Sequence, residues 1–245
     1  MKQLIKRTAL LFSSVGDVSQ SFTSWNGQER AYDIALAYYG NSSARAAELK
    51  NSCDFFLQRK AVKFSNLAYW CALHPEMLDK YDYIFVPDDD ITMTPEEIQR
   101  LLAMAKEGGY PVCSPAHSSD GRISWSHMRA EPEGGIVFTN FVEMTCPLFE
   151  ITALKRFLAA FQKYADFVSG TGTDFIISSA CGGPDRPFAV LHDIVVTNPT
   201  TVSKGLRRRE MDEVHSDSKR WSIWGSISRE FPFYPDNKVK FWRPE

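Results

Sequence analysis

The stretch YDYIFVPDDDI, residues 81–91, joins a short apolar run to a proline and three adjacent aspartates. The apolar part, residues 83–86, predicts a buried strand. Pro87 marks its end, because proline cannot donate a hydrogen bond to a neighbouring strand. The acidic triplet Asp88–Asp90 is therefore expected at the carboxyl end of a strand, which is where α/β sheets bind their ligands.

A helix is predicted directly after the triplet. Thr94 is a suitable N-cap, Pro95 suits the first helical position, and Glu97 completes a capping box. Apolar residues between 98 and 105 follow at helical spacing, and Gly108-Gly109 predicts the end of the helix. This helix should cover one face of a sheet and begin close to the acidic loop.

The rest of the chain alternates in the same way. Further strands are predicted at 8–15, 33–40 and 54–57, and helices at 64–78 and about 154–165. The alternation favours an α/β fold with a mostly parallel central sheet and helices on both faces. We expect a single domain over residues 1–245, whose last part, about 204–245, is rich in aromatic residues and wraps back onto the domain or covers the site as a lid.

The composition is that of a soluble globular protein, with 245 residues, 44% of them apolar and 24% charged. The net charge of −2 gives no overall attraction to nucleic acid. The five cysteines contain no Cys-x-x-Cys pair and are expected to be reduced, and no apolar stretch approaches the roughly 18 residues of a membrane span. We expect a cytoplasmic protein, with peripheral membrane contact left open and the oligomeric state not predicted.

The acidic triplet suggests a metal site. Adjacent carboxylates repel one another, and a divalent cation would relieve that repulsion. Mg²⁺ and Mn²⁺ are held by one or two carboxylates together with substrate phosphates. The alternative is a solvated acidic turn, which the position between a buried strand and a capped helix makes less favourable.

Residues 81–91 also resemble the signature segment of the family named domain of unknown function 707. Matching blocks occur in the same order at Ser14–Asp17, Asp33–Gly40, Lys63–Leu67, Thr139–Met144 and Gly170–Phe175. The resemblance implies a glycosyltransferase of the A-type fold, a Rossmann-like nucleotide-binding sandwich with an Asp-x-Asp metal motif. It implies Mn²⁺ or Mg²⁺ as cofactor and a nucleoside-diphosphate sugar as donor substrate.

The resemblance also implies roles for several residues on the donor side. Asp88 and Asp90 would face metal, ribose and diphosphate, with Asp89 between them. The loop of Val15, Gly16 and Asp17 would hold base and ribose, although an ordinary turn is an equal alternative.

Two basic residues are candidates for the diphosphate. Lys63 could reach it, although a solvated lysine is the commoner case. Arg207, in the basic run 204–209, could close over the donor, because an arginine fork matches diphosphate oxygens; a solvated basic loop is the alternative.

Two carboxylates are candidates for the catalytic base. Asp174 follows a glycine-rich segment, where A-type transferases often place this base, and a helix N-cap is the alternative. Glu143, on an apolar stretch, competes with it, and a partnered structural carboxylate is its alternative.

The third metal ligand is where the chain departs from the family pattern. The histidine expected of the family falls near Thr197 or Asn198, so His192 is the substitute candidate, with a structural histidine as the alternative.

The leading prediction is a metal-dependent transferase that moves a sugar from a nucleoside-diphosphate sugar to a hydroxyl of a glycan or lipid-linked acceptor, as in polysaccharide biosynthesis. One alternative is an inactive relative that binds nucleotide or glycan. A second is a sugar-phosphate nucleotidyltransferase, which the lack of a basic residue in the loop after the first strand disfavours.

Overall fold

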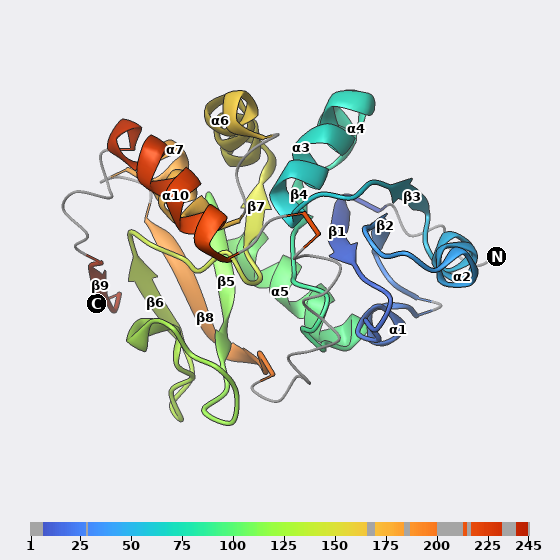
Figure 1. Ribbon diagram of the computed structural model, residues 1–245. Helices are drawn as coiled ribbons and strands as arrows, with labels where there is room; N and C mark the ends of the chain where they lie inside the picture. The colour runs from blue at the N-terminus through green and yellow to red at the C-terminus, as the bar shows by residue number, and fades with distance from the viewer. Residues whose placement is uncertain are drawn as a thin grey trace.

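A computed structural model of the protein describes residues 7–27, 29–165, 170–183, 187–199, 213–214, 217–231 and 239–244. Within them the strands form one nine-stranded sheet in the order β3-β2-β1-β4-β7-β5-β8-β6-β9 (Figure 1). The strands are β1 (Ala9–Val15), β2 (Tyr32–Tyr38), β3 (Phe55–Gln58), β4 (Tyr83–Phe85), β5 (Val112–His117), β6 (Ile136–Thr139), β7 (Leu148–Glu150), β8 (Phe188–Val196) and β9 (Phe241–Trp242).

The sheet is mixed, which corrects the prediction of a mostly parallel sheet. The half β3-β2-β1-β4 is parallel throughout. In the other half β5 and β8 are parallel, whereas β7 runs antiparallel to β4 and β5, and β6 antiparallel to β8 and β9. An apolar pattern indicates the burial of a strand but not its direction, so these reversals could not be predicted from it.

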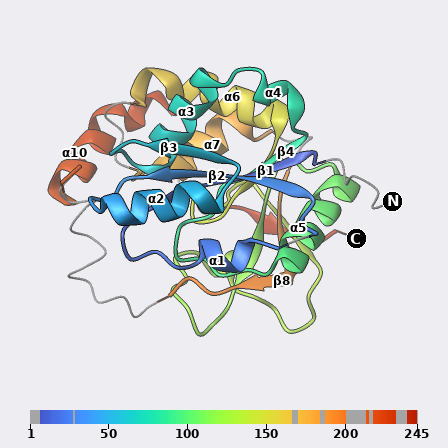
Figure 2. The same cartoon turned by 90° about the vertical axis from the view of Figure 1, so that its right-hand side faces the viewer.

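Helices cover both faces, as Figures 1 and 2 show. One face carries α3 (Lys63–Leu73), α4 (Met77–Lys80), α6 (Ile151–Phe161), α7 (Thr173–Cys181) and α10 (Asp217–Ile227). The other carries α1 (Phe22–Trp25), α2 (Ser43–Ser52) and α5 (Pro95–Gly108). Short 3₁₀ turns lie at η1 (Ser126–Met128), η2 (Gln162–Tyr164) and η3 (Ser228–Glu230).

Successive side chains of β1 pack alternately into the helix layers on the two faces of the sheet. Leu10 and Phe12 belong to the hydrophobic cluster under α3, α6 and α7, and Leu11 belongs to the cluster under α2 and α5. Successive side chains of a strand point to opposite faces, so a wholly apolar strand is buried on both sides.

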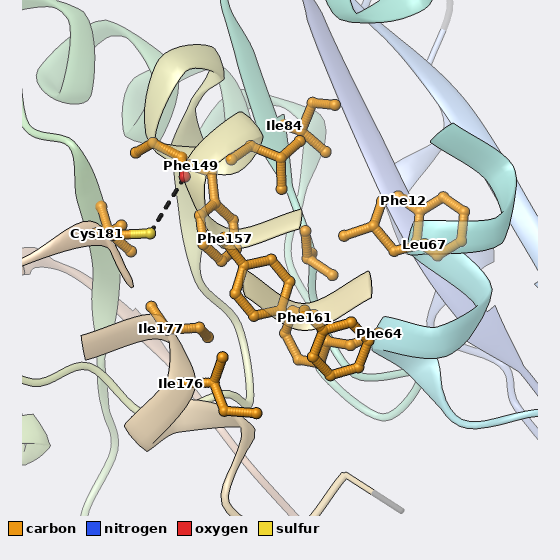
Figure 3. Packing of buried hydrophobic residues seen from close by; sticks show 14 of the residues in the cluster. Phe12, Phe64, Leu67, Ile84, Phe149, Phe157, Phe161, Ile176, Ile177 and Cys181 are labelled. Atoms are coloured by element: carbon orange, nitrogen blue, oxygen red, sulfur yellow. Dashed lines mark hydrogen bonds between the residues drawn. The ribbon is translucent and has the colours of Figure 1, made fainter. Parts of the chain in front are cut away.

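Aromatic rings fill the first of these clusters (Figure 3). Phe157 of α6 lies 5.4 Å from Phe64 of α3 and 5.0 Å from Phe161, centroid to centroid. Burying each such side chain stabilises the fold by about 1.5–3 kcal/mol. The Cys181 thiol lies beside them and donates to the Ala153 carbonyl at 3.2 Å. All five cysteines are free.

The predicted capping box is confirmed. Thr94 accepts from the Glu97 backbone N–H at 3.2 Å, the Glu97 carboxylate accepts from the Thr94 N–H at 2.7 Å, and Gly109 ends α5 in the left-handed region at φ 62°. The single helix predicted at 64–78 is wrong, because α3 stops at Leu73 and α4 starts at Met77. His74 precedes a proline, which disfavours helical geometry there.

No helix within the described residues is both long and apolar enough to span a membrane.

Candidate functional site

A cavity of about 690 Å³ opens beside the acidic triplet. Its walls come from the loops after β4, β5 and β8, the approach to β7, the start of α7, and α10. The lining residues are Asp88, Asp90, Arg122, Ser124, Trp125, Glu143, Met144, Thr145, Thr171, Gly172, Asp174, Phe175, Asn198, Arg220, Trp221 and Trp224. Asp88, Asp90, Glu143 and Asp174, predicted from separate parts of the sequence, therefore lie around one space.

The antiparallel strand β7 brings the triplet and Glu143 together. Beyond the end of β4, the Val86 N–H donates to the Pro147 carbonyl at 2.9 Å and the Asp88 N–H to the Thr145 carbonyl at 2.7 Å. These bonds extend the pairing of β4 with β7 into the loop. The approach to β7, which carries Glu143, is thereby held against the acidic loop.

Lys63 lies beneath Asp88. Its ammonium is 2.5 Å from Asp88 Oδ1 and also donates to the carbonyls of Val86, Met144 and Thr145 at 2.7–3.1 Å. The residue is only 7% exposed and does not line the cavity. Lys63 thus neutralises and fixes Asp88, and contact with a diphosphate stays a prediction.

Asp89 turns toward the first-strand loop. Its Oδ2 accepts from the Gly16 N–H and the Tyr39 hydroxyl, each at 3.1 Å, and its carbonyl accepts from Ser19 Oγ at 2.7 Å. A Cβ on Gly16 would lie 2.8 Å from the Tyr39 hydroxyl oxygen, so any larger residue would have to displace the Tyr39 ring. The triplet and the predicted nucleotide loop are therefore directly joined.

The other two residues of that loop have structural contacts. Val15 is buried in the core. Asp17 accepts from the Tyr38 hydroxyl, from the Asn41 N–H at 3.0 Å and from the Ser42 N–H at 3.2 Å. Asp17 thereby ties the loop after β1 to the loop after β2.

Two carboxylates of the triplet are suitable ligands for a hard divalent cation. Asp88 and Asp90 present carboxylate oxygens to the cavity, and Mg²⁺ is commonly held by one or two carboxylates plus substrate phosphates. No group of three or more His, Cys, Asp or Glu suited to a metal occurs in the part of the chain that the structure describes.

His192 lies outside the cavity lining. It is buried, and its Nδ1 accepts from the Glu131 N–H at 3.2 Å. Burial lowers its pKa. Asn198, close to the position where the family resemblance places a histidine, does line the cavity. Ligation by His192 stays a prediction.

Asp174 stands at the start of α7 and faces the cavity. Gly172, at φ 84°, occupies the N-cap position without a side-chain cap, and Asp174 Oδ1 accepts from the Phe175 N–H at 3.1 Å. Burial, together with a smaller contribution from the nearby charge of Glu143, raises the pKa of Asp174 to about 7. Such a carboxyl exchanges a proton near neutral pH.

Glu143 is the more enclosed carboxylate, with a side chain 11% exposed. Burial raises its pKa and so does the charge of Asp88, whereas hydrogen bonds from Ser124 and Thr145 act in the opposite direction. Its Oε2 lies 3.6 Å from Nδ1 of His117.

His117 is fully buried at the end of β5, where burial lowers its pKa to about 4. It is therefore neutral at neutral pH. His117 was not among the residues predicted from the sequence, because a histidine at the end of an apolar strand is typical of a structural position.

The C-terminal segment contributes through α10. Trp224 is 2% exposed and stacks on Phe175, with ring centroids 5.7 Å apart and planes at 15°. Trp221 is 67% exposed and lines the cavity beside Arg220. Arg220 and Arg122 could not be predicted as cavity residues, because single arginines form no pattern in the sequence. Arg207 and the rest of run 204–209 lie outside the described residues.

Comparisons with known proteins agree with the family resemblance. The model of the family described as "Protein of unknown function (DUF707)" matches residues 28–223, which confirms the predicted relationship. A search of curated proteins finds no match.

Two solved structures match most of this chain. The crystal structure of S. aureus TarS matches at a TM-score of 0.49 and 12% identity, over 94% of this chain and 44% of that chain. That of S. aureus TarS 1–349 in complex with UDP-GlcNAc matches at a TM-score of 0.56 and 10% identity, over 91% of this chain and 66% of that chain. This chain thus spans less than half the length of the first of them, and the likeness is one of α/β fold.

Proposed function

The chain belongs to the DUF707 family, and from the cavity it carries we propose that it is a metal-dependent glycosyltransferase of the A-type fold. The proposed reaction moves a sugar from a nucleoside-diphosphate sugar to a hydroxyl of a glycan or lipid-linked acceptor. One observation carries the proposal: four carboxylates from three separate segments line one cavity at the carboxyl end of β4. The UDP-GlcNAc complex of TarS, a protein of similar fold, supports the choice of donor.

In this proposal the donor lies across the triplet. The nucleoside occupies the side of Val15, Gly16 and Asp17, where Asp89 holds the loop through the Gly16 N–H. Asp88 and Asp90 would hold the cation, which when bound offsets the charge of the departing diphosphate. Lys63 keeps the Asp88 carboxylate in place from below.

The chemistry assigned to the chain is a proton transfer. The acceptor oxygen bonds to the anomeric carbon as the bond from that carbon to the diphosphate oxygen breaks. The electron pair of that bond leaves with the nucleoside diphosphate, and the hydroxyl proton goes to Asp174. Since the pKa of Asp174 is raised to about 7, it releases and accepts protons readily near neutral pH. Direct displacement of this kind inverts the anomeric centre.

Glu143 is the competing base. Its pKa is also raised, and its carboxylate lies deeper, against His117. We assign Asp174 first because Glu143 has additional hydrogen bonds, from Ser124 and Thr145, that hold its charged form in place.

The donor site is tested by calorimetric titration of UDP-GlcNAc in Mn²⁺. We expect binding by the wild-type protein and at least about tenfold weaker binding by Asp90→Asn, since even outer partners of a metal ligand contribute about 10–100-fold to metal affinity. Asp82→Asn is the matched control, because Asp82 is exposed at the opposite end of β4. Equal affinity in the Asp90→Asn protein, or no binding by folded wild-type protein to any of several nucleotide sugars, would contradict the proposal.

An inactive relative that binds nucleotide without turnover is the second candidate. The position of His192 outside the cavity lining favours it. Release of UDP from UDP-GlcNAc in the presence of acceptor mixtures separates the two, since only the transferase produces it. A nucleotidyltransferase would instead release pyrophosphate from a nucleoside triphosphate and a sugar phosphate.

We propose that the reaction takes place in the cytoplasm. The five free cysteines support this compartment, because thiols stay reduced there.

A further inference from the structure

Among the described residues, the cavity is lined by Asp88 and Asp90 and by segments around β5, β7, β8, α7 and α10, but not by Val15, Gly16 or Asp17. If the nucleoside lies on the Gly16 side, as in the function proposed above, then the cavity holds the transferred sugar and the acceptor. The chemistry of the side chains around the cavity therefore indicates which class of acceptor binds there.

Aromatic rings form one wall of this space. Phe175 and Trp224 are stacked on each other and fixed by packing, and Trp125 lies 6.5 Å from Phe175, centroid to centroid. Trp221, one turn before Trp224 on α10, is 67% exposed. An exposed indole at the mouth of a cavity offers a flat apolar face to a sugar ring while its N–H remains able to donate.

Charged side chains of both signs line this space, and Glu143 and Arg122 differ in exposure. Glu143 is enclosed, with 11% of its side chain exposed, and Asp88 is held from below by Lys63. Arg122 is exposed in the loop after β5, and its backbone N–H is tied to the Asn198 carbonyl at 2.7 Å. Arg220 precedes Trp221 on α10 and lines the same space.

We propose that the acceptor is an anionic saccharide. Trp221 stacks on its ring, Arg122 and Arg220 bind its carboxylate or phosphate, and the reacting hydroxyl points toward Asp174. Guanidinium groups match both anions with paired hydrogen bonds, whereas carboxylates and amides suffice for neutral hydroxyls. Arg122 is exposed whereas Glu143 is enclosed, so a sugar whose negative group is remote from its reacting hydroxyl is complementary to this cavity.

The test is calorimetric titration of the full chain with three probes, in saturating UDP and Mn²⁺: methyl glucuronide, glucose 6-phosphate and neutral methyl glucoside. At least one anionic probe should bind about tenfold or more tightly than the neutral one, as expected for a charge-assisted hydrogen bond. The stronger of the two anionic probes identifies carboxylate or phosphate as the recognised group. Equal affinity of all three probes, or failure of all three to bind, overturns the proposal.

Variants assign the preference to residues. Arg122→Gln and Arg220→Gln should each reduce the affinity for the anionic probe about tenfold and leave the neutral probe and UDP unchanged. Trp221→Ala should weaken anionic and neutral probes alike. Arg100→Gln, which changes an exposed arginine of α5 on the other face of the sheet, is the control and should change nothing.

Two outcomes keep this proposal separate from the proposed function. If Arg220→Gln weakens UDP binding and leaves the saccharide preference intact, the arginine serves the donor diphosphate and its role at the acceptor is overturned. If the wild-type protein does not bind UDP, the donor site fails, and the same titrations without UDP still measure the charge preference.

Discussion

Carboxylate side chains lie beside both halves of the sheet, but their surroundings differ. Beside the parallel half, Asp17 and Asp89 accept hydrogen bonds from backbone N–H groups and tyrosine hydroxyls. Beside the mixed half, Glu143 and Asp174 are enclosed more than they are compensated, and the pKa of each is raised. The first pair holds loops together, and the second pair is suited to carrying protons.

This difference follows from burial and hydrogen bonding. A carboxylate that accepts several hydrogen bonds is stabilised in its charged form, whereas burial with few donors favours the protonated form. Burial of a carboxylate among few hydrogen-bond donors reduces the stability of the fold, and such carboxylates are concentrated at functional sites. A change to one of these carboxylates should therefore affect function in the mixed half and stability in the parallel half.

The largest effect is expected for Asp174→Asn. Loss of a general base lowers turnover about 10²–10⁴-fold. In the wild-type protein, turnover should rise with pH up to a pKa of about 7 and then level off, because only the deprotonated carboxylate accepts a proton. The measurement is the rate of UDP release against pH. Asp120→Asn, at an exposed aspartate, is the control, and an unchanged rate in Asp174→Asn would transfer the role of base to Glu143.

The same variant should gain stability. Because the pKa of Asp174 is higher in the folded chain than in the unfolded one, the folded state holds the proton more tightly, and this contribution to stability falls as pH rises from about 4 to about 7. At pH 8 the substitution removes a poorly solvated charge, so we expect the free energy of unfolding to rise by about 1–2 kcal/mol, with partial exposure of the side chain limiting the gain. At pH 4 the gain should disappear. Urea unfolding at both pH values measures it.

Asp89→Ala should show the reverse, a loss of stability. It leaves the buried Tyr39 hydroxyl and the Gly16 N–H without their acceptor, which costs about 1–3 kcal/mol in the free energy of unfolding. Asp89→Asn keeps a carbonyl acceptor and should recover part of that loss. Asp90→Ala, at the neighbour that faces the cavity, is the matched comparison, and equal losses in the two alanine variants would remove the distinction drawn within the triplet.

Local signals in the sequence were sufficient for much of the fold. The strand exit at Pro87 and the capping box at Thr94 placed the triplet correctly between β4 and α5. Both signals depend on a few adjacent residues, whose backbone preferences survive tertiary packing. Glu143 and Asp174, selected as candidates for the catalytic base, both line the cavity, and the role of base stays a prediction.

Features that depend on distant contacts were not predictable. The direction of β7 decides that Glu143 meets Asp88, and no residue near Glu143 encodes that direction. Arg122 and Arg220 reach one cavity from segments about a hundred residues apart in the chain. The ion pair of Lys63 with Asp88 was not predictable either, because the carbonyl partners that hold its ammonium come from the segment after β4 and from the approach to β7.

The smallest effects are expected from a pair of glycines, one in each region. Gly16→Ala places a Cβ within 2.8–2.9 Å of the Tyr39 ring, whose hydroxyl is held by Asp89, so the ring cannot move away without losing that bond. Overpacking of this kind costs about 1–3 kcal/mol, and we expect the lower end because a side chain rather than backbone is displaced. Gly225→Ala meets no atom within 4 Å and lies inside α10, so it should instead stabilise the protein by about 0.5–1 kcal/mol through helix propensity. Thermal unfolding of the two variants should shift in opposite directions. A shift in the same direction would mean that the Gly16 loop tolerates displacement, and the tight coupling assigned to the parallel half would then have to rest on Asp17 alone.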